Sequence, residues 1–139
     1  MVNMTSLRTL SGTLAKSETT VSELVETALE RAEQSNSVFV ELNHGLLSLA
    51  ESIDQIRQSR GISPPLAGIP ITLKDLFDVR NEQTLAGSIA LKNSATPKDK
   101  DADVIAPLRE AGLLFLGRTN MSEFAVPMVT HTFFNKEDT

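Results

Sequence analysis

"GIPITLKDLFDV", residues 68–79, is a short apolar run that carries a lysine and an aspartate side by side. Its length and its β-branched residues are typical of a strand, and Pro70 lies near the start, where a strand tolerates proline. Side-chain alternation puts Lys74 on the face opposite to Ile71 and Leu73. The pattern leaves two interpretations open. Lys74 either ends the strand with its stem packed and its ammonium in water, or it is buried so that its neutral amine serves as a base.

Upstream of this stretch, residues 1–60 are predicted to be helical. In TTVSELVETALERAEQ, Thr20 is followed three residues later by Glu23, which is the pattern of a capping box. A further helix is predicted over about 45–59, ended by a glycine and two prolines, and a shorter helix before Lys16. The helix after Thr20 has apolar residues at helical spacing along one face: Val21, Leu24, Val25, Ala28, Leu29 and Ala32.

Downstream, the pattern predicts a helix, a strand and the start of another helix. DVIAPLREAG is the helix, with Asp101 or Asp103 as its cap and Gly112 as its left-handed stop. LLFLG, residues 113–117, is predicted as a buried strand, and TNMSEFA, residues 119–125, begins the last helix. Helices, strand, helix, strand and helix in this order indicate an α/β sheet with helices on its faces.

The composition excludes several classes of protein. A length of 139 residues is that of one domain, and a net charge of −5 with scattered Lys and Arg disfavours a surface for nucleic acid or anionic membranes. Without cysteine, the chain has no disulfide, no thiolate nucleophile and no cysteine-ligated metal. No apolar run approaches 18 residues and no signal-peptide pattern is present, so we expect a cytoplasmic protein outside the membrane.

Two other motifs are weak. Residues 112–119, GLLFLGRT, resemble a phosphate-binding loop, but the four residues between the glycines read as a buried strand and Arg118 replaces the required lysine. His44 and His131 have neither a serine partner in a nucleophile motif nor the spacing of a metal site, so each is interpreted as a surface histidine. We therefore expect no nucleotide, no metal and no other cofactor.

Three blocks together resemble the first part of the amidase signature family. They are PPLAGIPITLKDLFDV, TLAGS and DADVIAPLREAGLLFLGRTNMSEFA, and they match in order and spacing over residues 64–125. The resemblance implies the N-terminal portion of that α/β fold, a mixed sheet covered by helices on both faces. Residues 1–139 are then one segment of a single domain, with a helical part over 1–60, the family blocks over 64–125 and a divergent tail over 126–139, and the sheet is incomplete in this chain.

The resemblance also implies a chemistry. Members of the family use a Ser-cisSer-Lys triad to hydrolyse carboxylic amides to an acid and ammonia or an amine, and some deliver the ammonia to a second site. The family lysine corresponds to Lys74, whose implied role is that of a general base acting through a bridging serine on the nucleophilic serine. Burial lowers the pKa of a lysine amine, which places the neutral form near the working pH and makes a histidine unnecessary. The flanking blocks thus favour the buried interpretation of Lys74.

Other positions that match the family blocks have turn or loop roles. Asn81 stands where the family often has glycine, and asparagine is the residue that best tolerates the left-handed conformation after glycine. Gly87 allows a close backbone approach, and Ser88 is not the catalytic serine of the family pattern. A purely structural role stays open for all six of these positions: Gly68, Pro70, Asn81, Thr84, Gly87 and Ser88.

Met121, Ser122 and Glu123 lie near the substrate region of the family. The resemblance implies that they line the pocket, and a capped helix start explains the same residues equally well. The identity of the amide stays open among small aliphatic or aryl amides, glutamine, fatty amides and urea-derived carboxamides.

The chain departs from the family in two places. Both family serines lie in a glycine- and serine-rich block that the 139 residues do not contain, and Pro107 is expected four to six residues into a helix, where it removes one backbone donor. Three explanations stay open: a fragment or truncated product that is inactive alone, a short non-catalytic relative that binds a partner, and one segment of a split enzyme. The possible partners are a completing chain or further copies of this one.

Overall fold

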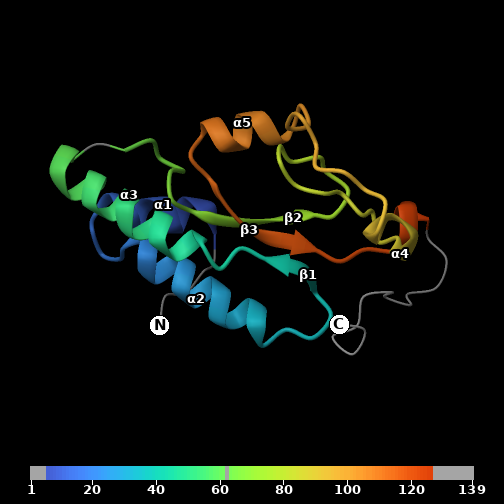
Figure 1. The fold of residues 1–139 in the computed structure, drawn as a ribbon. Coiled ribbons are helices and arrows are strands. Elements are labelled where there is room, and N and C mark those ends of the chain that lie inside the picture. Colours follow the sequence, from blue (N-terminus) through green and yellow to red (C-terminus); the bar gives the residue numbers. More distant parts are fainter. Residues whose placement is uncertain (1–5, 62, 127–139) are drawn as a thin grey trace.

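Three strands form a small mixed sheet with helices on both of its faces (Figure 1). The computed structural model describes residues 6–61 and 63–126. Helices α1, α2 and α3 lie on one side of the sheet and α5 lies on the other (Figure 1), as expected for the α/β class. The elements are α1 (Leu7–Ala15), α2 (Val21–Glu33), β1 (Phe39–Leu42), α3 (Leu46–Arg60), β2 (Pro70–Lys74), α4 (Ile89–Lys92), α5 (Ile105–Glu110), β3 (Leu114–Thr119) and the 3-10 helix η1 (Glu123–Ala125).

The strand β3 is the centre of the sheet, which has the order β1-β3-β2. β1 pairs with β3 antiparallel, and β2 pairs with β3 in parallel, with Lys74 opposite Thr119. Each pairing contains one register shift, between Phe39 and Glu41 in β1 and between Ile71 and Thr72 in β2. Because β2 and β3 are parallel, their carboxyl ends meet at one edge of the sheet. α5 lies in the connection between these two strands.

The strand β1 corrects the prediction that residues 1–60 are helical throughout. Phe39–Leu42 has only four residues, FVEL, which is too short a run to display a clear period of two. Its strand conformation comes from the ladder with β3, so the pairing partner lies about 80 residues further along the chain.

The three N-terminal helices were otherwise predicted correctly. The Thr20 hydroxyl accepts a hydrogen bond from Glu23 N at 3.1 Å, and the Glu23 carboxylate accepts one from Thr20 N at 3.0 Å. Asp54 of α3 adds a second cap to α2, since its carboxylate accepts hydrogen bonds from the backbone N of Val21 and Ser22 at 2.8 and 2.9 Å. The N-terminus of α2 is therefore held both locally and by the neighbouring helix.

The helix α5 is shorter than expected and starts later. Neither Asp101 nor Asp103 caps it, because the N-cap is Val104, which makes no side-chain capping bond. Pro107 is the third residue of α5 and not the fourth to sixth. An N–H at this position has no intrahelical acceptor, so the missing donor of Pro107 costs the helix no hydrogen bond. Gly112, with φ of 81°, follows the C-cap Ala111 and ends the helix as predicted.

The helix expected to begin in residues 119–125 is also absent from the described chain. Only the single turn η1 forms, and Phe124 and Ala125 have φ of 50° and 60°. Phe124 N donates to Ala86 O at 2.8 Å, so a contact with a distant loop takes the backbone out of the helical path.

Two apolar clusters fill the two sides of the sheet. The larger cluster joins Leu114 and Leu116 of β3 to the three N-terminal helices, and the smaller joins Leu73 and Phe115 to α5. Residues 112–119 are thus a glycine followed by a largely buried strand, which confirms the buried strand predicted for LLFLG.

Candidate active site around Lys74

Most of the predicted site residues lie where the parallel strands β2 and β3 end, while Gly68 and Pro70 lie at the start of β2. The loop of residues 75–88 leaves the end of β2, and residues 120–125 leave the end of β3, on the side where Figure 1 shows α4. In open α/β sheets, this carboxyl edge is the usual place for a ligand site. The structure therefore brings Lys74 and the loop residues singled out by the sequence to one end of the molecule.

Lys74 is the last residue of β2 and is exposed. Its side chain makes no hydrogen bond or ion pair with the described residues, and its backbone O accepts bonds from Leu76 N at 2.6 Å and Phe77 N at 3.1 Å. In the described chain this arrangement matches the strand-end interpretation of Lys74 and not the buried one that the flanking blocks favour. Burial of Lys74 stays a prediction for a site completed by further chain.

A buried ion pair lies directly beside Lys74, and the sequence analysis did not find it. The Arg118 Nε lies 2.8 Å from the Asp75 Oδ1, and the two side chains are 4% and 0% exposed. In the sequence each is a charge within an apolar run, a signal that marks both residues as unusual but does not pair them across 43 residues. Breaking a buried pair of this kind by removing one partner typically costs about 3–5 kcal/mol.

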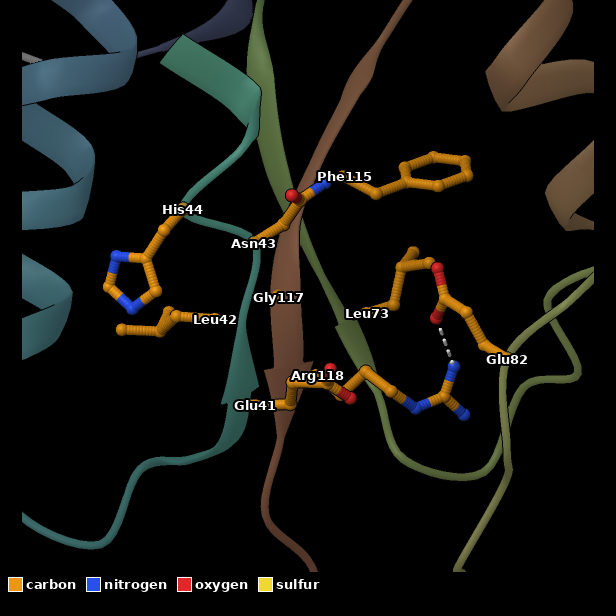
Figure 2. A pocket seen from close by; sticks show the side chains of 9 residues that line it. All are labelled: Glu41, Leu42, Asn43, His44, Leu73, Glu82, Phe115, Gly117 and Arg118. Atoms are coloured by element: carbon orange, nitrogen blue, oxygen red, sulfur yellow. Dashed lines mark hydrogen bonds and ion pairs between the residues drawn. The ribbon is translucent and has the colours of Figure 1, made fainter. Parts of the chain in front are cut away.

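The Arg118 guanidinium also fixes the loop that follows β2. It donates to Phe77 O at 2.8 Å, to the Thr84 Oγ1 at 3.2 Å and to the Glu82 Oε2 at 3.1 Å, the last of which Figure 2 shows. Leu85 N donates to the Asp75 Oδ1 at 3.3 Å. Thr84 thus helps to anchor this loop to Arg118.

The second oxygen of Asp75 has a different environment. Asp75 Oδ2 is buried and has no hydrogen-bond partner among the described residues. A buried acceptor without a partner costs free energy of folding, so Arg118 satisfies only one of the two carboxylate oxygens of Asp75.

Gly87 and Ser88 lie against residues 121–123, at the start of η1. Gly87 has φ of 69°, and a Cβ added there would collide with Met121 O. The Ser88 hydroxyl donates to the Glu123 Oε1 at 2.6 Å, and Ser88 is fully buried. Met121 is buried and Ser122 half-buried at the same place. The predicted residues of the two loops are therefore in direct contact.

Backbone strain is concentrated in these loops. Ala86 has φ of 49° and Phe124 has φ of 50°, and their backbones are hydrogen bonded to each other. Non-glycine residues in this region cost roughly 1–3 kcal/mol each and tend to occur at functional sites. Asn81, with φ of 68°, adopts the left-handed conformation expected of it, and its N donates to Lys98 O at 2.8 Å.

Gly68 and Pro70 shape the entry to β2. Gly68 has φ of 90°, and a Cβ added there would lie 2.5 Å from the Val21 Cγ2 of α2. Pro70 is the first residue of the strand, where its missing N–H is tolerated. These two positions are structural in the described chain.

A cavity of about 430 Å³ opens on the sheet beside Arg118. Figure 2 shows the side chains that line it. Leu73, Glu82 and Phe115 line it on one side, and Glu41 and His44 contribute from β1 and the residues after it. A second cavity of about 690 Å³ lies among residues of α1, α3 and the segments that follow them. Lys74 lines neither of these two cavities, so neither is an amide pocket formed around the lysine.

The remaining candidates lie apart from this edge. His44 is exposed, with its Nδ1 3.5 Å from the Glu33 Oε1, and His131 lies outside the described residues. Among residues 6–61 and 63–126, no group of three or more histidine, aspartate or glutamate side chains is arranged to hold a metal ion. Within the same ranges, no helix is long and apolar enough to cross a membrane.

Comparison with known proteins shows which family the chain resembles. The Amidase family model matches residues 23–135, a range that continues into the stretch expected to diverge. A glutamyl-tRNA(Gln) amidotransferase subunit from Cupriavidus taiwanensis is 38% identical over 127 residues, covering 89% of this chain and 25% of the relative. The chain thus spans about a quarter of the length of this relative.

Solved structures agree with this match. The native peptide amidase of Stenotrophomonas maltophilia has a TM-score of 0.73 at 32% identity, over 86% of this chain and 25% of the amidase. A protein from a vestigial complex that reveals the origins of an s-triazine catabolic enzyme has a TM-score of 0.76 at 30% identity, over 86% of this chain and 27% of that one. With the family model matched over most of its length, the chain belongs to the amidase family, in agreement with the resemblance of its three blocks.

Proposed function

We propose that this chain supplies the general base of an amidase that hydrolyses carboxylic amides to an acid and ammonia or an amine. The observation that carries the proposal is the place of Lys74. It ends β2 at the edge where β2 and β3 finish side by side, inside the block that resembles the family's lysine segment. The described loops with strained backbone lie at the same edge.

The chemistry assigns Lys74 one proton transfer. Its neutral amine accepts a proton from a bridging serine, which takes the proton of the nucleophilic serine as that oxygen attacks the amide carbonyl. The C–N bond then breaks and ammonia or an amine leaves with the proton. Water afterwards hydrolyses the acyl-serine to the acid and restores the serine. Both serines are contributed by sequence outside the 139 residues, in the same protein or in another chain.

This assignment makes residues 1–139 the lysine-bearing, N-terminal segment of one catalytic domain. It follows that the 139 residues alone turn over no amide, because the nucleophile is missing. The substrate is a small molecule with a carboxamide group.

A second candidate is an amidase that works inside an assembly and passes its ammonia to a partner. The observation in its favour is the name of the relative, which is one subunit of an amidotransferase. A third possibility is a non-catalytic module that binds a partner. In such a module Lys74 would transfer no proton.

The test uses a version of the protein that contains a glycine- and serine-rich block, either from its own downstream coding sequence or from a co-expressed completing chain. That version is expected to release ammonia from simple amides, and Lys74→Ala should reduce the rate to background. Lys98→Ala is the matched control, because Lys98 lies in an adjacent loop and pairs with Asp78 at 3.5 Å. Full activity of the Lys74→Ala protein would exclude the base role.

The same preparation separates the other candidates. An amidase within an assembly should release less free ammonia when its partner and acceptor are present, with the transferred nitrogen found in the acceptor. A binding module should release none in any combination and should hold its partner equally well with Lys74→Ala.

A further inference from the structure

The cavity of about 430 Å³ on the sheet has no role in the proposed function, because Lys74 does not line it. Its size lies within the range of about 300–1,000 Å³ that is typical of small-molecule sites. The register places Glu41 of β1 and Leu73 of β2 opposite Arg118 of β3, one on either side of it. Residues that pair directly across strands point to the same face of a sheet, so these three residues form one row across the sheet.

The helix α5 covers only part of the face that carries this row. Leu73 and Phe115 belong to the apolar cluster that packs against α5, and the Arg109 guanidinium of α5 lies 4.8 Å from the centre of the Phe115 ring. No described residue of β1 belongs to that cluster. The cavity, which residues of β1 also line, therefore lies where the sheet continues to β1 beyond the cover of α5.

The cavity has an apolar floor, by which we mean the lining side chains of Leu42, Leu73 and Phe115. Figure 2 shows Gly117 between Leu42 and Leu73, and this glycine has no side chain to fill the space. A Cβ added to Gly117 would collide with Glu41 O, so the glycine also lets β1 and β3 approach closely. A ligand in this cavity would bury an apolar body against the floor.

The charged groups around the cavity leave it with an excess of negative charge. The Arg118 guanidinium is paired both with the Asp75 Oδ1 at 2.8 Å and with the Glu82 Oε2 at 3.1 Å, and its side chain is only 4% exposed. The Glu41 side chain is exposed and makes no hydrogen bond or ion pair with the described residues. The carboxylates near the row thus outnumber the one guanidinium, and that of Glu41 is available to a ligand.

We infer that this cavity binds a small organic cation, an ammonium group carried on an apolar body. The ammonium has three N–H donors for the carboxylates of Glu41 and Glu82, and the body packs on the apolar floor. His44 does not cancel this preference for a cation, because its Nδ1 lies 3.5 Å from the Glu33 Oε1, which offsets any positive charge on the imidazole. The volume of the cavity is that of a site for a free small molecule, which is the occupant that we assign.

The test uses phenethylamine, which is cationic at pH 7, as the probe and isothermal titration calorimetry of the full 139-residue chain as the measurement. The matched ligands are 2-phenylethanol and phenylacetate, which carry the same ring with a neutral and an anionic group. Phenethylamine should bind at least about tenfold more tightly than either, and high salt should weaken it, because the attraction acts between charges that solvent reaches. Equal affinity for the three ligands would overturn the inference.

Substitution of the two carboxylates locates the site. Glu41→Gln and Glu82→Gln should each weaken the binding of phenethylamine about fivefold, which corresponds to one charge pair at about 4 Å in water. Glu41→Lys should reverse the order, so that phenylacetate binds more tightly than phenethylamine. Glu51→Gln removes the same charge from the exposed surface of α3, outside the cavity, and should leave the affinity unchanged. An equal loss in Glu51→Gln and Glu41→Gln, or no loss in either, would refute the cavity as the site.

Circular dichroism reports whether each variant is folded. If Glu82→Gln unfolds, the two Glu41 variants decide the question, because the Glu41 side chain has no partner to lose among the described residues. Lys74→Ala should bind phenethylamine as the native chain does, so this outcome is independent of amide hydrolysis. Much tighter binding of an acetylated lysyl-phenylalanine amide than of phenethylamine would assign the cavity to a protein side chain and overturn the small-molecule occupant.

Discussion

Gly87 combines a left-handed backbone with a close contact to the opposing loop. Its φ is 69°, and the place where a Cβ would lie is occupied by Met121 O. Ser88 next to it is fully buried and bonded to Glu123. These residues hold the loop after β2 against the segment after β3. A methyl group at Gly87 would therefore displace the backbone of both segments.

At this residue we predict that Gly87→Ala destabilises the fold by about 1–3 kcal/mol, since an alanine is strained in the left-handed conformation and displaces Met121. Thermal melting of matched preparations measures the effect. Gly12→Ala is the control, because Gly12 lies inside α1 with no atom within 4 Å of an added Cβ. That variant should gain about 0.5–1 kcal/mol. A Gly87→Ala protein that melts at the native temperature would contradict the contact.

At the scale of elements, α5 is tied to the loop after β2 by one aspartate. The Asp101 carboxylate accepts bonds from the Arg109 Nε and from Arg80 N, both at 2.8 Å. The Arg109 guanidinium also lies 4.8 Å from the centre of the Phe115 ring in β3. The hydrogen bond from Arg109, followed by that from Arg80, lowers the pKa of Asp101 from 3.8 to about 2.

This pKa predicts a pH dependence with a definite sign. Because the pKa of Asp101 is lower in the folded chain, its contribution to stability is complete above about pH 4 and is lost as the pH falls towards about 2. Asp101→Asn should therefore lower the melting temperature at pH 6 and have a progressively smaller effect down to pH 2.5. Asp99→Asn, an exposed neighbour in the same loop, is the control and should change little throughout. A difference for Asp101→Asn that does not shrink in acid would rule out the charged contact.

At the scale of the molecule, the sheet has two outer strands, β1 and β2, each paired only with β3 among the described residues. β2 carries the apolar sequence PITLK, and unpaired apolar strands promote association between chains. The family match to a quarter of a longer relative is consistent with further strands or helices covering these edges.

We predict that the 139-residue chain self-associates when it is expressed alone. Thr72→Lys, at an exposed position of β2, should raise the monomeric fraction, because a charge on an edge strand opposes pairing. Gln55→Lys changes the net charge equally on the exposed surface of α3 and should not. Size-exclusion chromatography with light scattering measures both. A native chain that is monomeric and unfolds cooperatively would contradict the prediction.

The sequence by itself determined the parts of this protein that depend on near neighbours. The helix after Thr20 followed from its capping box and apolar spacing, β2 and β3 from short apolar runs, and the turns at Asn81 and Gly112 from the residues that tolerate a left-handed backbone. The three amidase blocks could also be recognised from the sequence, because a block is defined by the identity and spacing of neighbouring residues.

Only the tertiary structure decided the features that depend on distant partners. β1 is a strand because β3 pairs with it, and η1 stays a single turn because Ala86 binds its backbone. Asp75 meets Arg118 across 43 residues, a pairing that no local pattern specifies. Lys74 lies exposed at the end of β2, a position that the described fold and not the local pattern decides.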